Sequence, residues 1–243
     1  MSETKKIQEL FKTAEEEGSL SPASAHTFKV ADIGNRIKAA LGVKVDDVKA
    51  SEVTLATTLI DDSGSIRFAS NADVVRDGHN LMLDALSESK QEHSILAHTR
   101  YLNGKILFPY CLVKQAVRMD EHNYNPNLGT PLYDESVVIL GTVLAKVQEF
   151  ADNGVPARSV TLLVSDGADE HSCRSTAKNV ADIVNDMLKS EIHIIAAMGI
   201  DDGGRTDFRR VFKEMGIRDE WILTPGNTKS EIRKAFQLFS KSA

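Results

Sequence analysis

From residue 53 onward the chain alternates between β-prone runs and segments with helical periodicity, and this alternation limits the possible folds most strongly. The clearest β-prone runs are "VTLATTLI" (53–60), "SVTLLVS" (159–165) and "IHIIAAMGI" (192–200), and helix-patterned segments stand between and after them. Parallel strands need a crossover, usually a helix, to return the chain to the same end of the sheet. The pattern therefore predicts a doubly wound α/β fold, with helices on both faces of a mostly parallel sheet.

One hairpin interrupts this alternation. The segment "HSILAHTRYLNGKILFPYCLV" (93–113) contains two β-prone runs separated by Asn103 and Gly104. Asn-Gly is a strong signal for a tight turn between antiparallel strands. Pro109, in the second run, has no N–H to donate to a neighbouring strand, so that strand belongs at the edge of a sheet. We therefore expect one antiparallel edge strand.

The first 50 residues have a different pattern, which predicts two short helices joined by the turn-rich segment "GSLSPAS" (18–24). We divide the chain into an N-terminal helical extension, residues 1–50, and an α/β domain, residues 51–243. Both predicted helices have an apolar face that needs a surface to cover, so we expect them to pack on the α/β domain. The apolar positions are Ile7, Leu10, Phe11 and Ala14 in the first helix, and Val30, Ile33, Ile37, Ala40 and Leu41 in the second.

Composition narrows the classes of function. The formal net charge of −6 is spread along the 243 residues and no basic run is present, which argues against nucleic acid as a partner. The N-terminus "MSETKKIQEL" has no apolar signal core, and no window approaches the ~18 consecutive apolar residues of a membrane span. We expect a cytoplasmic protein without membrane contact. Cys111 and Cys173 are too few for a disulfide framework, and we expect two reduced cysteines used in packing.

The stretch "TLIDDSGSI" (58–66) carries a buried strand directly into acids, serines and a glycine. In open α/β sheets, ligands bind outside the carboxyl ends of the strands. Asp61, Ser63 and Ser65 occupy alternate positions there, so a tight loop at Gly64 can turn three oxygen-bearing side chains toward one point. Hard divalent cations such as magnesium prefer oxygen ligands of this kind.

Two further loops offer ligands of the same type. Thr130 in "NLGTPL" stands just before a predicted helix, in which we expect Asp134 to be a helix cap, and Asp166 in "LLVSDGADE" follows a buried strand. Only two of these five side chains carry a charge, and the three hydroxyls are neutral donors. The cation would stay electrophilic toward another carboxylate.

These residues resemble the metal-ion-dependent adhesion site of von Willebrand factor A (vWA) domains. D-x-S-x-S in "DDSGS", the Thr of "GTPL" and the Asp of "VSDG" occur in the family's order and in its strand–loop–helix context, and the resemblance covers about residues 51–243. It implies a metal site of Asp61, Ser63, Ser65, Thr130 and Asp166 that holds Mg²⁺, Mn²⁺ or Ca²⁺, with Asp61 and Asp166 often acting through water. The family commonly has a small residue where this chain has Asp62.

The C-terminal segment "ILTPGNTKSEIRKAFQLFSKSA" (222–243) resembles the intracellular bacterial vWA proteins of the tellurite-resistance type. That resemblance implies an adaptor or assembly factor, in settings that include AAA+ ATPases and stress response, which binds a partner's Asp or Glu through the metal. We expect a partner-binding rim of Asp62, Asp169, Glu170 and His171 beside the site. For residues 169–171, a solvated loop is the alternative.

An enzymatic alternative is a Mg²⁺-dependent phosphohydrolase of the haloacid-dehalogenase type, which also places an Asp after its first strand. Asp201 and Asp202 would then supply its late acidic pair. Such an enzyme needs a second carboxylate two residues after the first as its acid/base group. This chain has Ser63 there, and a hydroxyl cannot fill that role at neutral pH. We therefore expect a binding module and no enzymatic activity.

Overall fold

The computed structural model describes residues 3–31, 33–200, 205–225 and 229–240, and its centre is a six-stranded sheet with the order β3-β2-β1-β4-β5-β6. All neighbouring strands pair in parallel except β2 and β3, which are antiparallel. This confirms the predicted fold class. The strands are β1 (Val53–Ile60), β2 (Ile95–Tyr101), β3 (Ile106–Leu112), β4 (Ala157–Ser165), β5 (His193–Gly199) and β6 (Ile222–Leu223).

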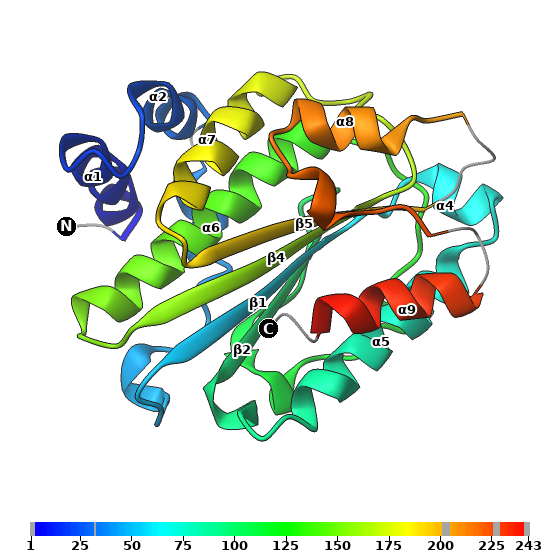
Figure 1. Ribbon diagram of the computed structural model, residues 1–243, viewed down its shortest axis with the longest axis horizontal. Coiled ribbons are helices and arrows are strands. Elements are labelled where there is room, and N and C mark those ends of the chain that lie inside the picture. Colours follow the sequence, from blue (N-terminus) through cyan, green and yellow to red (C-terminus); the bar gives the residue numbers. More distant parts are fainter. Residues whose placement is uncertain (1–2, 32, 201–204, 226–228, 241–243) are drawn as a thin grey trace.

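Helices cover both faces of this sheet (Figure 1), and each face has its own apolar core. On one face lie α6 (Leu132–Asp152), α7 (Ala177–Lys189) and α8 (Phe208–Glu214). On the other lie α5 (Ala72–Ser87) and α9 (Lys229–Ser240), with the short α4 (Gly64–Phe68) between β1 and α5. The 3₁₀ helices are η1 (Val45–Asp47), η2 (Glu92–Ser94), η3 (Val113–Gln115) and η4 (Asp219–Trp221).

The β2–β3 hairpin forms as predicted, with Gly104 at a φ of 85° in its turn, and β3 stands at the edge of the sheet. The exposed backbone of this edge strand is partly covered by the end of the N-terminal segment. The Tyr110 N–H donates to the carbonyl oxygen of Ala40, and the Val43 N–H donates to that of Tyr110. Gly42, at a φ of 59°, makes this approach possible, because a Cβ there would stand 2.0 Å from the Tyr110 oxygen.

The described residues of the N-terminal segment form three α-helices where the sequence predicted two helices: α1 (Glu3–Glu16), α2 (Pro22–Val30) and α3 (Gly34–Lys38). The prediction was wrong because α2 begins inside the segment that was interpreted as a turn. Ser21 caps it, accepting the N–H of Ser24, and Pro22 provides the fixed φ that suits a first helical position. Val30, expected on the apolar face, is exposed.

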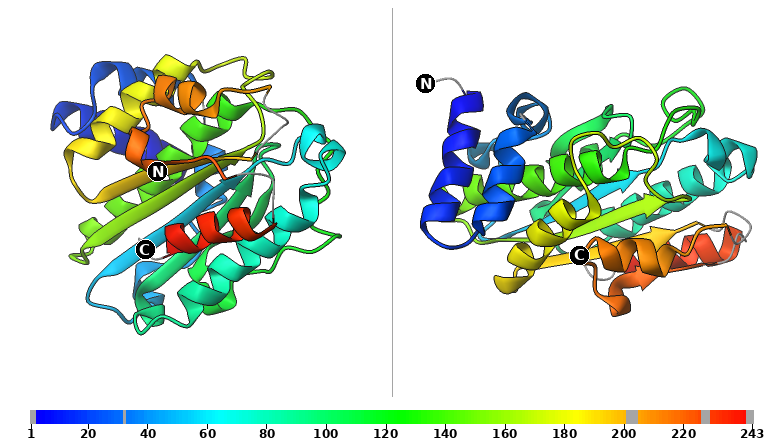
Figure 2. Two further views of the ribbon diagram at one scale, coloured as in Figure 1. Left: turned by 45° about the vertical axis from the view of Figure 1, so that its right-hand side comes forward. Right: turned by 90° about the horizontal axis from the view of Figure 1, so that it is seen from above.

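These helices share the core of α6 and α7, as their apolar faces predicted. The Phe11 and Phe28 rings stack with centroids 4.1 Å apart, and Ile37 is completely buried. Figure 2 shows α1 and α2 at the end of the molecule away from α4. The N-terminal helices therefore complete the hydrophobic core beside the α/β domain.

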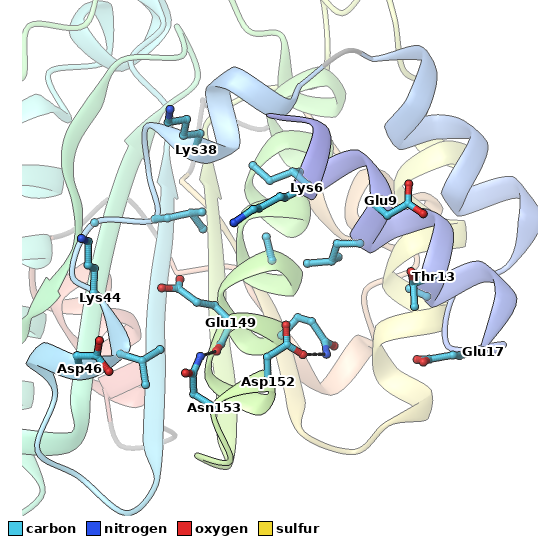
Figure 3. A pocket seen from close by; sticks show the side chains of 18 residues that line it. Lys6, Glu9, Thr13, Glu17, Lys38, Lys44, Asp46, Glu149, Asp152 and Asn153 are labelled. Carbon is cyan, nitrogen blue, oxygen red and sulfur yellow. Dashed lines mark hydrogen bonds between the residues drawn. The ribbon is translucent and has the colours of Figure 1, made fainter. Parts of the chain in front are cut away.

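A cavity of about 900 Å³ lies between α1, α3, η1 and the second half of α6 (Figure 3). Its walls include apolar side chains such as Ile7 and Leu10, with charged groups around them. In Figure 3, Lys6 and Lys38 lie toward one end of the cavity and Asp152 toward the other. It adjoins the end of α6 that is farthest from Thr130, so it does not belong to the predicted metal site.

Candidate metal centre

Three loops meet at the carboxyl ends of β1 and β4, where the strand order reverses and α/β sheets bind ligands. Ile60 and Val164 are partners in the parallel ladder, and the Asp61 N–H continues it by donating to the Val164 oxygen over 3.0 Å. The register of two buried strands therefore brings Asp61 and Asp166 to one point. This is the reason that two acids about a hundred residues apart in the sequence can share a site.

Asp166, Ser63 and Ser65 form a tight triangle of oxygens. The Ser63 and Ser65 hydroxyls are 2.8 Å apart, and they lie 3.3 and 2.8 Å from Asp166 Oδ1. An octahedral magnesium ion with metal–oxygen distances of about 2.1 Å holds adjacent ligand oxygens about 3.0 Å apart. The three side chains thus match one face of such an octahedron, and the donor set fits a divalent cation.

Asp61 is fully buried and holds the loops together. Its Oδ1 accepts the Ser63 N–H over 2.8 Å, and its Oδ2 accepts the Ser165 hydroxyl over 2.7 Å and the Asp166 N–H over 3.4 Å. Burial raises the pKa of Asp61, and these hydrogen bonds oppose that shift. Sequence reasoning missed Ser165, although it directly precedes Asp166. Tyr124, also missed, donates its hydroxyl to the Asp61 carbonyl oxygen over 2.6 Å.

The Thr130 segment is tied to both other loops through the backbone. Leu128 pairs with Ser63 as an isolated bridge, and its carbonyl oxygen accepts the Gly64 N–H over 3.0 Å. On the other side, the Thr130 N–H donates to His171 Nδ1 over 2.9 Å, and its carbonyl oxygen accepts the His171 N–H over 3.4 Å. Thr130 itself is buried, 6% exposed. The structure therefore brings together the segments of all five predicted metal ligands.

Asp134 is not the cap of α6, which begins after Pro131, so the predicted role was wrong. It lies in the first turn, and its carboxylate instead accepts the backbone N–H groups of residues 173, 174 and 175. In return, Ser172 Oγ accepts the Asp134 N–H, and Asp169 Oδ1 accepts the Tyr133 N–H. The loop after Asp166 and the start of α6 thus cap each other.

The predicted partner-binding rim is only partly at the surface. Asp62 is 3% exposed, and its carboxylate accepts both the backbone and the side-chain N–H of Asn103, so its place in the rim was wrong. Burial raises the pKa of Asp62 to about 6. Asp169 is half-buried and bonded to Ser172, whereas Glu170 and His171 are exposed.

A buried ionic cluster supports the helix that follows Thr130. Glu135, in the first turn of α6, forms an ion pair with Arg36 of α3, and its Oε2 lies 3.6 Å from Nη1 of Arg100 of β2. Arg100 is fully buried and also donates to the Arg36 carbonyl oxygen over 3.0 Å. Sequence reasoning missed this cluster, because its members come from three distant segments.

The remaining predicted features add no second metal site. In the described ranges, no group of three or more His, Cys, Asp and Glu side chains is arranged to bind a metal ion. Asp201 and Asp202 of the enzymatic alternative lie outside the described residues. Cys111 is half-buried, but Cys173 is exposed, so its predicted packing role was wrong. No helix within the described residues has the length and apolar character needed to cross a membrane.

Neither protein-family models nor curated protein sequences give a match to this chain. Solved structures do match in fold. The pilus adhesin SpaC from Lactobacillus rhamnosus GG gives a TM-score of 0.58 at 14% identity, over 80% of this chain and 30% of SpaC. The vWF domain of the pilus tip protein Mfa5 from Porphyromonas gingivalis gives a TM-score of 0.53 at 9% identity, over 79% of this chain and 95% of that domain.

A third match is the proximal thread matrix protein 1 of the mussel byssus, in a structure with a zinc-occupied MIDAS (metal-ion-dependent adhesion site) motif. Its TM-score is 0.51 at 17% identity, over 78% of this chain and 48% of the mussel protein. This chain thus spans about a third to a half of the length of SpaC and the mussel protein. At these identities the likeness establishes the fold, and the chain has a vWA fold.

Proposed function

We propose that this protein is a non-enzymatic interaction module that binds an Asp or Glu side chain of a partner protein through a divalent cation. The observation that carries this proposal is the triangle of Ser63, Ser65 and Asp166 oxygens at the carboxyl end of the sheet, with separations of 2.8 to 3.3 Å. The zinc-occupied MIDAS motif of the mussel protein supports a metal in this fold. For this chain, we favour Mg²⁺, with Mn²⁺ and Ca²⁺ as alternatives.

Each ligand residue has a defined task in this proposal. Ser63, Ser65, Thr130 and Asp166 supply oxygens to the cation, and Asp61, whose carboxylate is bonded to two loops, keeps them in place and acts through water. The bound cation would supply an electrophilic position for the partner's carboxylate. Ser65 is the exposed member of the triangle, so the site opens to solvent on that side.

Titration calorimetry with Mg²⁺ and Mn²⁺ tests the metal site. We expect the Asp61→Ala/Asp166→Ala variant to lose binding, whereas an Asp84→Ala/Asp219→Ala control, which removes two exposed surface carboxylates, should bind like the wild type. Equal affinities of wild type and the Asp61/Asp166 variant would refute the site.

The proposal of no enzymatic activity rests on Ser63, which stands where a phosphohydrolase of the haloacid-dehalogenase type needs its acid/base carboxylate. Ser63 is bonded to Ser65 and Asp166, and its hydroxyl cannot act as an acid/base group at neutral pH. Hydrolysis of p-nitrophenyl phosphate with Mg²⁺ tests this point. Turnover that disappears in Asp61→Ala would favour the enzyme.

We further propose an intracellular bacterial adaptor or assembly role, with AAA+ ATPases among the candidate partners, on the strength of the C-terminal resemblance. Affinity capture from the native host, with wild type and Asp61→Ala in parallel, tests it. A partner that is retained by the wild type and lost with the variant would support the role. Identical sets of captured proteins would contradict it.

A further inference from the structure

Large apolar side chains are exposed at five places among the described residues: Val30, Phe68, Val117, Leu128 and Ile192. Isolated exposed apolar residues are normal on protein surfaces. Two of these five, however, lie in segments of the candidate metal site: Phe68 ends helix α4, and Leu128 lies two residues before Thr130. Phe68 is 80% exposed and Leu128 is 49% exposed.

Both residues lie against residues 63–65, where helix α4 begins. A Cβ placed on Gly64 would stand 3.5 Å from the Phe68 ring, so the ring lies beside the first residue of α4. Leu128 pairs with Ser63, and its carbonyl oxygen accepts the Gly64 N–H. Phe68 and Leu128 thus flank the segment that provides two of the metal's hydroxyl ligands.

The local structure fixes this exposure. Ile66, two residues before Phe68, is fully buried in the core beneath α5 and α9 and holds the short helix α4 in place. The Phe68 side chain therefore stays outside. Arg67 places its guanidinium carbon 5.2 Å from the centroid of the Phe68 ring, which puts a positive charge beside the same surface.

We propose that Phe68 and Leu128 form an apolar edge of the metal site and contact an apolar side chain that neighbours the partner's coordinating carboxylate. This inference rests on the proposed function. The occupant is a segment of a partner protein that carries Asp or Glu with an apolar residue one or two positions away. An extended chain advances about 3.3 Å per residue, so an apolar residue that close in sequence stays beside the coordinating carboxylate. The charge of Arg67 matches such an acidic segment.

The expected contribution is moderate. Burial of one apolar side chain against Phe68 and Leu128 should raise affinity by about 5- to 30-fold over a peptide with glycine at the same place. A Phe68→Ser/Leu128→Ser variant should lose that gain. It should keep its affinity for Mn²⁺, because neither side chain provides a ligand.

An array of synthetic nonapeptides tests this inference with the full-length protein. Each peptide has a central Glu, and its neighbouring positions vary over all amino acids. The array is probed with and without Mn²⁺, and Gln replaces the central Glu in a matched set. We expect Mn²⁺-dependent binding to Glu peptides that favours apolar neighbours. The preference should vanish in Phe68→Ser/Leu128→Ser and persist in the control Val30→Ser/Ile192→Ser, which removes exposed apolar residues elsewhere.

The outcomes separate this inference from the proposed function. Mn²⁺-dependent binding to Glu peptides without preference for apolar neighbours, or a preference that survives in Phe68→Ser/Leu128→Ser, would overturn the apolar edge alone. No Mn²⁺-dependent binding to any Glu peptide, with Mn²⁺ itself bound, would overturn the carboxylate-binding function and the edge together. A calorimetric Mn²⁺ titration of every variant accompanies the array.

Discussion

The loops at the carboxyl end of the sheet and the helices α1 to α3 differ in the kind of side chain that they bury. The loops bury polar oxygens of Asp61, Ser63 and Asp166 and connect them by hydrogen bonds. The helices bury apolar side chains such as Phe28 and Ile37 against α6 and α7. Burying polar groups costs free energy that only good hydrogen bonds offset, whereas burying apolar groups drives folding.

The proposed ligand site and much of the apolar packing therefore lie in separate parts of this chain. Changes to the apolar side chains of α1 to α3 should lower stability and leave metal affinity alone. One connection between the two regions is the ion pair of Arg36 with Glu135, which joins α3 to the helix that follows Thr130. The following predictions test that separation.

Removal of residues 1–48 should have the largest effect. It deletes apolar side chains that are buried against α6 and α7, and it would expose the apolar surface of those helices to water. We expect an aggregated or unfolded chain, measured by circular dichroism and sedimentation. A melting temperature and solubility equal to those of the full chain would show that the segment is only a tether. The lost side chains include Ile7, Phe11, Leu20, Phe28, Ile33 and Ile37.

The single change Phe28→Ala should destabilise the protein by about 3–5 kcal/mol, because it leaves a cavity beside Phe11. Chemical denaturation measures this loss, and Mn²⁺ affinity of the folded variant should equal that of the wild type. Val30→Ala, on the same helix but at an exposed position, is the matched control with little expected change. A large loss of Mn²⁺ affinity in Phe28→Ala would show that the packing of the N-terminal helices also controls metal binding.

Arg36→Ala should affect both regions. It removes a hydrogen bond to the charged Glu135, so we expect about 1–3 kcal/mol lower stability and up to ~10-fold weaker Mn²⁺ binding, through displacement of the α6 start next to Thr130. Arg36→Lys should recover part of both. Arg158→Ala, which removes a surface ion pair with Glu52, is the control. Unchanged Mn²⁺ affinity in Arg36→Ala would mean that the two regions are not connected.

Asp186→Asn should give the smallest effect, and one that depends on pH. Burial opposes ionisation of Asp186, but bonds from Lys189, Ser24 and Ser21 outweigh it and lower its pKa to about 2. A carboxyl with a lowered pKa stabilises the fold above its unfolded pKa of about 3.9, and this contribution is lost as the pH falls toward 2.

We therefore expect Asp186→Asn to unfold about 1–2 kcal/mol more easily than the wild type at pH 7, with the difference shrinking between pH 4 and pH 2. Denaturation at several pH values measures it. Asp182→Asn, on the same helix and paired with Lys178, is the control. A difference that stays constant down to pH 2 would show that the charge of Asp186 does not stabilise the contact between α2 and α7.

Local sequence patterns were enough to predict the sheet and to point to candidate ligand residues. Alternating strand and helix patterns are short-range properties, and they correctly gave the parallel strands, the hairpin at Asn103 and Gly104, and the edge strand with Pro109. The spacing of Asp61, Ser63 and Ser65 after a buried strand predicted that these side chains lie close together, since a strand end fixes where the next few side chains can lie.

Which charged groups are exposed, and which contact the segments of the candidate metal centre, depends on how distant elements pack. Asp62 is buried beside the neighbouring hairpin, where its carboxylate accepts the backbone N–H of Asn103. Arg36 meets Glu135 because α3 packs on α6, and no local pattern records that contact. Periodicity identifies the face of an element that is apolar, but the partner of a single polar side chain depends on how distant elements pack, and that is settled only when the core is assembled.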